Sequence, residues 1–488
     1  SARMPEREDF SYWPSCCSRK WPESVKENAL EQLMSSGKTG ALNMFIKHGE
    51  VLQDDGRDRP RAVVSAGITH QAAVAVAFKV FETILFSEKN CGNWSIKHAT
   101  KKQVVKKIAA AFNKRRMKGD ETLVGEGDGS AWDWAIAFWM KYEHEIVSHV
   151  FSLVEHAVPR ADILENLTKK RAKPPVCFAR AYAKEEKEGI ESMLKWVFRE
   201  RNYRFSGDRG TSSLNFVCNM ALLRSAFLSD GEAWWADTSK TDFHLGYSRL
   251  DVDGMNTWVY EDSDEVVYFA MFAEGDDSIF KMTAEKTLDG LGEATAALIS
   301  ANGMKFEMIL HSGNSAITFV GMKILMSEDV VTTTAFPELK RNLISSAFSK
   351  SKDAQVDERA LNAVGYYTMM ARAVAFSDLP AISSYFFAVA EGWKARAKVK
   401  KPIAVSSLTD EDEREITFRT NMNLSDLQSW RPNHTTSPEA VKLAQMQGYI
   451  YTPNDIFPVC IDPYSRAEDA LPQSLQEWAR DMTPTETY

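Results

Sequence analysis

Residues 265–282 read E-V-V-Y-F-A-M-F-A-E-G-D-D-S-I-F-K-M. Two runs rich in Val, Ile, Phe and Tyr flank Gly275, which predicts a β-hairpin with a tight turn. Asp276 and Asp277 would then lie at the tip of a largely buried hairpin, where a bound cation relieves their repulsion most readily. Carboxylate oxygens suit a hard ion such as Mg²⁺. The alternative is an ordinary turn, because Gly and Asp both favour turns.

The size and composition of the chain narrow its class. It has 488 residues, 44% of them hydrophobic, which is enough for a large core and two or three subdomains. Its six cysteines lack the spacing of a zinc site or a disulfide framework, so a reducing, intracellular setting is expected. No apolar run approaches the length of a membrane span. Any membrane association is therefore expected to be peripheral or through a partner.

The charge is unevenly distributed along the chain. Residues 1–120 hold 21 Lys and Arg against 13 Asp and Glu, whereas the rest holds 38 against 54, and the net charge is -8. The acidic total argues against a protein that coats nucleic acid in general. The basic first part indicates a region that meets phosphates, with ordinary variation of surface charge as the alternative.

Two segments carry this basic charge. Residues 44–64 read as two strands joined by a polar turn, and arginines spaced two apart would share one face of the ribbon: Arg57, Arg59 and Arg61. Guanidinium groups so placed can grip a polyphosphate, unless the neighbouring aspartates pair with them. Residues 97–118 contain nine Lys and Arg and no acidic residue, with apolar residues at helical spacing. They predict an amphipathic helix whose cationic face is solvated or lines a nucleic-acid path.

Another carboxylate is predicted at a strand end. A short strand is expected to end at Asp128 and a helix to begin near Trp132, which puts Asp133 in the first helical turn. Next to the hairpin, Asp128 would supply the second arm of a two-ion site for phosphoryl transfer. Asp133 could instead simply favour the start of its helix through the dipole.

A polar set follows later in the chain. A loop containing Ser206 and Gly207 precedes a helix that is expected to begin close to Thr211, with Asn215 one turn inside it. Ser, Thr and Asn on one helical edge offer donors and acceptors for a sugar hydroxyl, although Thr211 could also be only an N-cap. Residues 163–205 are charged and are expected to be helical in parts.

The last third is expected to be mainly helical. Apolar periodicity predicts helices over residues 356–376 and 382–399, and the acidic residues 409–415 are expected to link to a polar, Pro-rich tail. Four side chains here could stack on an initiating nucleotide, although ordinary packing explains them more simply: Trp430, His434, Tyr449 and Tyr451.

Three of these sets form an ordered series. Asp128-x4-Asp133, Ser206-Gly207-x3-Thr211-x3-Asn215 and Gly275-Asp276-Asp277 resemble motifs A, B and C of viral RNA-dependent RNA polymerases. The run S-G-D-R-G-T-S-S-L-N is similar to the tombusvirus- and flavivirus-like branch of positive-strand RNA viruses, and R-D-R-P-R-A-V-V resembles its motif F. Met304-Lys305 and the run I-T-F-V-G-M-K-I-L at residues 317–325 resemble motifs D and E.

The resemblance implies an α+β fold shaped like a right hand, with an antiparallel palm sheet and a mainly helical thumb. The implied parts are residues 1–120 (fingers with motif F), 121–150 (palm motif A), 151–205 (fingers), 206–330 (palm motifs B to E) and 331–488 (thumb and C-terminal tail). The implied function is template-directed RNA synthesis from ribonucleoside triphosphates, which replicates a viral RNA genome. The alternatives are another palm-type nucleotidyl transferase and a non-catalytic RNA-binding replication protein.

The resemblance also implies roles for individual residues. Asp128, Asp276 and Asp277 would be catalytic ligands of two Mg²⁺ ions, with Mn²⁺ as a substitute, and Lys305 would be a general acid towards pyrophosphate. The residues implied to bind the nucleotide are Lys47, Arg59 and Arg61 at the triphosphate and Asp133, Ser206, Thr211 and Asn215 at the ribose. The implied partners are RNA template and product, with viral or host replication proteins that bring the chain to membrane-associated sites in the host cytoplasm.

Overall fold

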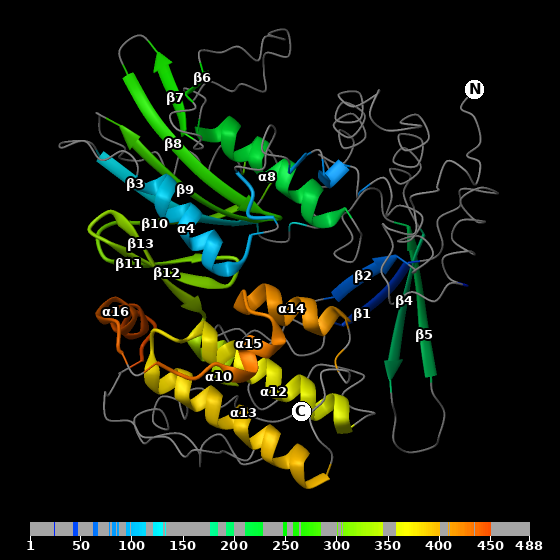
Figure 1. Cartoon of the computed structure of the whole chain (residues 1–488). Coiled ribbons are helices and arrows are strands. Elements are labelled where there is room, and N and C mark those ends of the chain that lie inside the picture. The colour runs from blue at the N-terminus through cyan, green and yellow to red at the C-terminus, as the bar shows by residue number, and fades with distance from the viewer. Residues whose placement is uncertain are drawn as a thin grey trace. The chain divides into compact units, whose positions relative to one another are not determined.

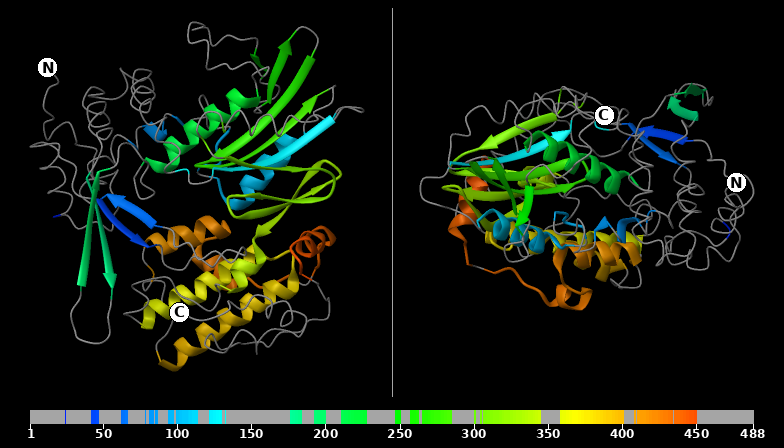
Figure 2. Two further views of the ribbon diagram at one scale, coloured as in Figure 1. Left: turned by 180° about the vertical axis from the view of Figure 1, so that it is seen from behind. Right: turned by 90° about the horizontal axis from the view of Figure 1, so that it is seen from above.

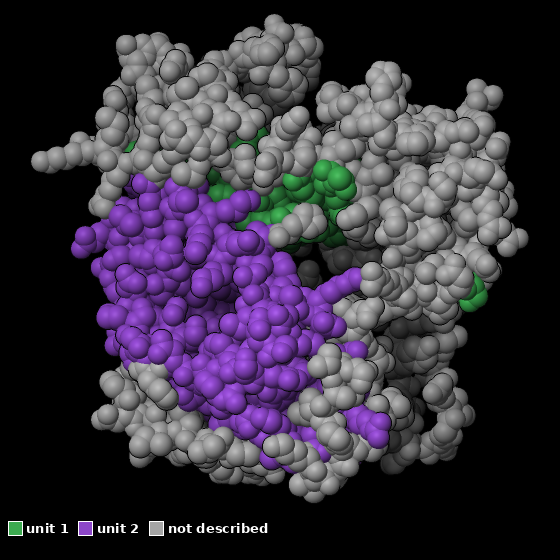
Figure 3. Space-filling view, in the orientation of Figure 1, with its two compact units in different colours: residues 1–97, 125–310 green, residues 98–124, 311–488 purple. Residues whose placement is uncertain are grey.

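The computed structural model of the chain describes a set of separate ranges (Figure 1). These are residues 42–46, 62–66, 94–97, 99–113, 121–129, 176–183, 192–199, 210–227, 247–250, 257–262, 265–284, 306–344, 358–400, 410–433 and 435–449, with residues 24, 78, 81–83, 85–86, 132, 300, 304 and 408. The chain divides into two compact units, residues 1–97 with 125–310 and residues 98–124 with 311–488 (Figure 3). Helices and mostly antiparallel strands occur together, so the predicted α+β class is confirmed.

A six-stranded sheet has the order β10-β3-β9-β8-β7-β6, and its residues belong to the first unit except for 121–124 of β3 and His311 of β10. The strands are β3 (Glu121–Gly129), β6 (Tyr247–Leu250), β7 (Thr257–Asp262), β8 (Glu265–Glu274), β9 (Asp277–Ala284) and β10 (Phe306–His311). β6 to β9 pair in sequence as an antiparallel meander, which confirms the hairpin predicted over residues 265–282. β8 lies inside the sheet, between β9 and β7, and its consecutive residues Ala270 to Ala273 are buried on both faces.

Helix α8 (Thr211–Phe227) packs against β8, and Figures 1 and 2 show it lying along the sheet. Its apolar residues are not confined to one stripe, as expected of a helix that is buried on more than one side. Leu214, Phe216 and Leu223 are almost fully buried. The helix predicted to begin close to Thr211 is therefore confirmed.

A four-stranded sheet of the same unit has the order β2-β1-β4-β5. Its strands are β1 (Leu42–Ile46), β2 (Ala62–Ala66), β4 (Val176–Ala183) and β5 (Ser192–Arg199). β1 and β2 are antiparallel, which confirms the two strands predicted within residues 44–64. The helical expectation for residues 163–205 is wrong where the structure describes them, because β4 and β5 form an antiparallel hairpin. Their Val, Phe, Tyr and Trp side chains fit a pleated surface better than a helix.

The second unit combines an antiparallel three-stranded sheet, β11-β12-β13, with helices. The elements are α4 (Lys101–Phe112), β11 (Ser315–Phe319), β12 (Met322–Ser327), β13 (Val330–Pro337), α10 (Leu339–Ile344), α12 (Glu358–Ala375), α13 (Pro380–Lys400), α14 (Asp410–Thr420), α15 (Leu424–Ser429) and α16 (Pro438–Met446). α4 and α16 pack against the sheet, while α12 packs against α13, α14 and α15. Buried aromatic rings such as Tyr367, Phe376 and Phe386 fill the core between these helices.

The helices of the second unit confirm some predictions and correct another. α12 and α13 match the periodicity over residues 356–376 and 382–399. The acidic residues 409–415 are not a linker in their described part, since they enter α14. Ile416 and Thr420 lie one turn apart and are both buried. The helix therefore packs through one face, which its acidic composition did not indicate. In the part of the chain that the structure describes, no helix is both long and apolar enough for a membrane crossing.

Candidate functional site

The hairpin β8–β9 ends in a two-residue turn. Glu274 pairs with Asp277 in the ladder, which leaves Gly275 and Asp276 as the turn residues. Gly275 has a φ of +64° and Asp276 has no positive φ, the arrangement of a type II′ turn. A Cβ at Gly275 would meet nothing within 4 Å, so the backbone conformation, not space, requires glycine there. Gly275 is buried, and both aspartates are half-buried.

Strand β3 lies beside β9 and brings Asp128 next to this turn. Ser278 Oγ donates a hydrogen bond to the carbonyl oxygen of Gly127 at 3.2 Å. A Cβ at Gly127 would lie 2.3 Å from the ring of Phe306, so glycine lets this ring pack directly on the strand. Because side chains alternate along a strand, Glu126 and Asp128 share the face opposite Gly127.

The carboxylates at the turn influence one another strongly. Burial, followed by the charges of its neighbours, raises the pKa of the Asp277 carboxyl to about 7. The neighbours responsible are, in decreasing order of effect, Asp276, Asp128, Glu274 and Glu126. β3 and the hairpin thus gather negative charge where it is poorly solvated, and such a cluster either retains a proton near neutral pH or attracts a cation.

The donor set suits a hard divalent ion, because every group in it is a carboxylate. Within the ranges described above, no three or more His, Cys, Asp or Glu side chains are arranged to hold a metal ion by themselves. Asp128, Asp276 and Asp277 are brought together, and their role as metal ligands stays a prediction.

Helix α8 presents a row of polar residues spaced by four, Thr211, Asn215 and Asn219, which places them along one face. Asn215 is buried and Thr211 is half-buried. Asn219 Nδ2 donates hydrogen bonds to the carbonyl oxygens of residues 275–277, at 3.2, 2.8 and 3.3 Å in chain order. The sequence interpretation missed Asn219, although its spacing from Asn215 was a signal that could have found it.

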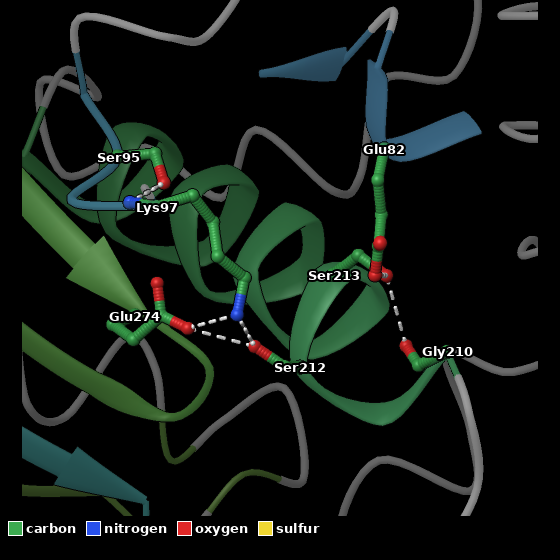
Figure 4. Close-up of polar contacts among 7 residues, drawn as sticks. All are labelled: Glu82, Ser95, Lys97, Gly210, Ser212, Ser213 and Glu274. Carbon is green, nitrogen blue, oxygen red and sulfur yellow. Dashed lines mark hydrogen bonds and ion pairs between the residues drawn. The ribbon is translucent and has the colours of Figure 1, made fainter. Parts of the chain in front are cut away.

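Lys97 forms a second link between α8 and the hairpin. Its Nζ donates to Ser212 Oγ at 2.7 Å and to Glu274 Oε1 at 2.5 Å, and Ser212 Oγ donates to the same Glu274 oxygen at 2.8 Å (Figure 4). The segment that carries Lys97 also runs beside β8, because Ser95 forms a parallel bridge with Ala273. The amine therefore offsets part of the negative charge at the base of the turn.

The position of Lys97 corrects the helix predicted over residues 97–118. The observed helix α4 begins at Lys101 because Thr100 caps it. The backbone N–H of Gln103 donates to Thr100 Oγ1, and the backbone N–H of Thr100 donates to Gln103 Oε1. Lys97 thus lies before the helix and outside its cationic face. The amphipathic character is confirmed, since Val104, Val105 and Ile108 are buried among charged neighbours.

Several predicted site residues cannot be located in this way. The residues in question lie outside the described residues: Lys47, Arg59, Arg61, Asp133, Ser206 and Lys305. Their assignments to the nucleotide and to proton transfer stay predictions.

Of the four side chains predicted to stack on an initiating nucleotide, two lie within the described residues. Tyr449 is fully buried and belongs to the core of the second unit, while the partly buried Trp430 packs against that core. Ordinary packing therefore accounts for both side chains. His434 and Tyr451 lie outside the described residues.

Comparison with known proteins does not decide the function, since no family model and no curated protein matches the chain. The candidate site therefore consists of the carboxylates of β3 and the β8–β9 turn, together with the polar row on α8.

Proposed function

We propose that the chain is an RNA-dependent RNA polymerase with a right-hand fold, which copies a viral RNA template from ribonucleoside triphosphates. One observation carries the proposal: β3 brings Asp128 beside the Asp276–Asp277 turn in a single sheet. Two carboxylate-bearing elements far apart in sequence meet where a phosphoryl-transfer site needs them. The order of the three motifs along the chain adds to this support.

The carboxylates have distinct tasks in this proposal. Asp128 and Asp276 supply negative charge beside the turn, and the half-buried Asp277 keeps a proton near neutral pH until positive charge arrives. Bound Mg²⁺ would neutralise the triphosphate and lower the pKa of the attacking 3′-hydroxyl. Lys97, through Glu274, limits the repulsion at the base of the turn in the free protein.

Helix α8 would select the sugar. Thr211 and Asn215 offer hydroxyl and amide groups that can donate to or accept from a ribose 2′-hydroxyl, which favours ribonucleotides over deoxyribonucleotides. In the second unit, α4 carries exposed Lys102 and Lys106 and no acidic residue, a surface suited to the phosphate backbone of RNA. Replication proteins of the virus or host would bring the enzyme to membrane-associated sites in the host cytoplasm.

Template-directed incorporation tests the proposal. The chain is incubated with a homopolymer RNA template, the complementary labelled ribonucleotide and Mg²⁺, with Asp276→Asn as the site variant. Asp426→Asn is the matched control, because Asp426 is an exposed carboxylate on α15 in the other unit. We expect incorporation by the wild type and the control, and a loss on the order of 1,000-fold or more in Asp276→Asn, because charge at the transition state is no longer stabilised.

Each other outcome favours a different protein. Product formed without a template would indicate another palm-type nucleotidyl transferase. RNA binding without incorporation by the wild type would indicate a non-catalytic replication protein. Equal activity in Asp276→Asn and the wild type would overturn the proposed role of the turn.

A further inference from the structure

We propose that Asn219 is a positioning residue, which holds the Gly275–Asp277 turn from helix α8 and thereby fixes where the Asp276 and Asp277 carboxylates lie. The catalytic consequence rests on the proposed function. The structural part does not, because the conformation of the turn can be measured without activity.

The turn needs such a partner. In a two-residue turn, backbone carbonyls leave the ladder of the hairpin, and a buried carbonyl without a partner is unfavourable. Gly275 is buried and Asn219 is fully buried, so water does not readily take the place of the amide. Asn219 Nδ2 instead meets all three carbonyl oxygens of residues 275–277, the shortest distance being 2.8 Å to Asp276.

The other half of the same amide argues for a specific role. Among the described residues, Asn219 Oδ1 is buried without a hydrogen-bond partner. A leucine branches in the same way and would fill a buried helix position without that unfavourable oxygen. The stability of α8 alone therefore does not account for asparagine here, whereas the donation to the turn does.

Asn362 on α12 provides a contrast within the chain. It is also buried in a helix, but neither side-chain atom, Nδ2 or Oδ1, has a hydrogen-bond partner in the described structure. Asn362 holds no turn in place. It is therefore the matched control for any substitution of a buried asparagine.

Holding the turn from α8 has a functional consequence. Thr211 and Asn215 lie on the same face of this helix, so one rigid element carries the proposed ribose contacts and also holds the carboxylates. Reacting groups that are misplaced by about 1 Å can lower a rate on the order of 100-fold. Loss of the Asn219 contact should then affect the chemical step more than nucleotide binding.

The experiment compares Asn219→Leu, Asn219→Asp and Asn362→Leu with the full wild-type chain. Leucine removes the donor, while aspartate keeps the shape and puts an acceptor opposite three carbonyl oxygens. Hydrogen exchange of metal-free protein is followed over the peptide covering residues 271–282. Primer extension then gives kcat, the KM for the ribonucleotide and the half-saturating Mg²⁺ concentration.

In both Asn219 variants, we expect faster exchange confined to residues 271–282. We also expect kcat to fall on the order of 100-fold, little change in KM, and a higher half-saturating Mg²⁺ concentration. Asn362→Leu should leave all four quantities near wild type. Unchanged local exchange, or exchange that rises equally throughout the first unit, would overturn the inference. If the wild type copies no template, the proposed function fails, and the exchange measurement still decides the role of Asn219.

Discussion

Two hairpins of the molecule have turns of the same length and opposite character. In the first unit, β8 and β9 are joined by Gly275 and Asp276 in a partly buried turn surrounded by carboxylates. In the second unit, β11 and β12 are joined by Val320 and Gly321, which carry no charge. There Val320 has a φ of +47° and Gly321 one of +69°, the type I′ arrangement.

The difference shows which unfavourable feature each hairpin contains. The first turn places glycine where φ is positive and so avoids backbone strain, but it gathers negative charge. The second turn avoids charge, but it holds a β-branched residue in the left-handed region, which costs about 1–3 kcal/mol. Crowded charge of this kind is typical of functional sites, and we proposed above that this one binds a cation.

The first prediction concerns pH. The pKa of Asp277 is raised from 3.8 to about 7, so the folded chain holds this proton more tightly than the unfolded chain. Tighter proton binding by the folded chain therefore adds to the free energy of unfolding. This stabilisation is fully present below the unfolded pKa and is lost as pH rises towards 7, by a few kcal/mol at most. Thermal unfolding of metal-free protein should therefore show Asp277→Asn gaining stability over the wild type between pH 5 and pH 8.

Mg²⁺ provides the check on this pH effect. It should stabilise the wild type more at pH 8 than at pH 5, because it competes with the proton for the same carboxylates. If the difference in stability between the wild type and Asp277→Asn stays constant across this pH range, the neighbouring carboxylates and burial do not raise the pKa of Asp277.

The second prediction compares one substitution in both hairpins. Lys97→Met removes the charged partner of Glu274 and leaves the hydrogen bond from Ser212. Because the side chains of Lys97 and Glu274 are only partly exposed, we expect a loss of about 2 kcal/mol in the free energy of unfolding. Lys323→Met in the second hairpin is the matched control. Within the described residues, Lys323 Nζ donates to the neutral hydroxyl of Thr318 and not to a carboxylate, so its loss should be about 0.5 kcal/mol or less.

A double variant separates charge from packing. Lys97→Met combined with Glu274→Gln removes both charges and should recover part of the lost stability, as measured by urea unfolding. If the double variant is as unstable as the sum of its single variants, the ion pair is not what stabilises the base of the turn.

The third prediction concerns the uncharged turn. Val320→Gly removes the strain of a β-branched residue at positive φ, and we expect a gain of about 1 kcal/mol. Gly275→Ala makes the opposite change in the charged turn and should lose about 1–2 kcal/mol, since its Cβ meets no atom and only the backbone resists. Thermal unfolding measures both, and a loss of stability in Val320→Gly would mean that packing of the valine outweighs its strain.

Some elements could be predicted because their cause is local. The hairpin over residues 265–282 follows from an apolar run interrupted by a turn glycine, and α4 follows from apolar residues at helical spacing. The strands β4 and β5 were not predicted, because the many charged residues of this segment drew attention away from its β-forming residues. Their pairing with each other is visible only in the folded hairpin. The helix α14 was missed because one anchored face is enough to hold an otherwise acidic helix.

The candidate site shows the same division. The residue pattern alone predicts which carboxylates stand at a strand end and at a turn, and which polar residues share a face of α8, because these are local features of one element. The pairing of β3 with β9, the ion pair of Lys97 with Glu274 and the hydrogen bonds from Asn219 to the turn arise only when the chain is folded. Contacts between distant segments depend on sheet order and packing, and the spacing of residues within a single element does not predict them.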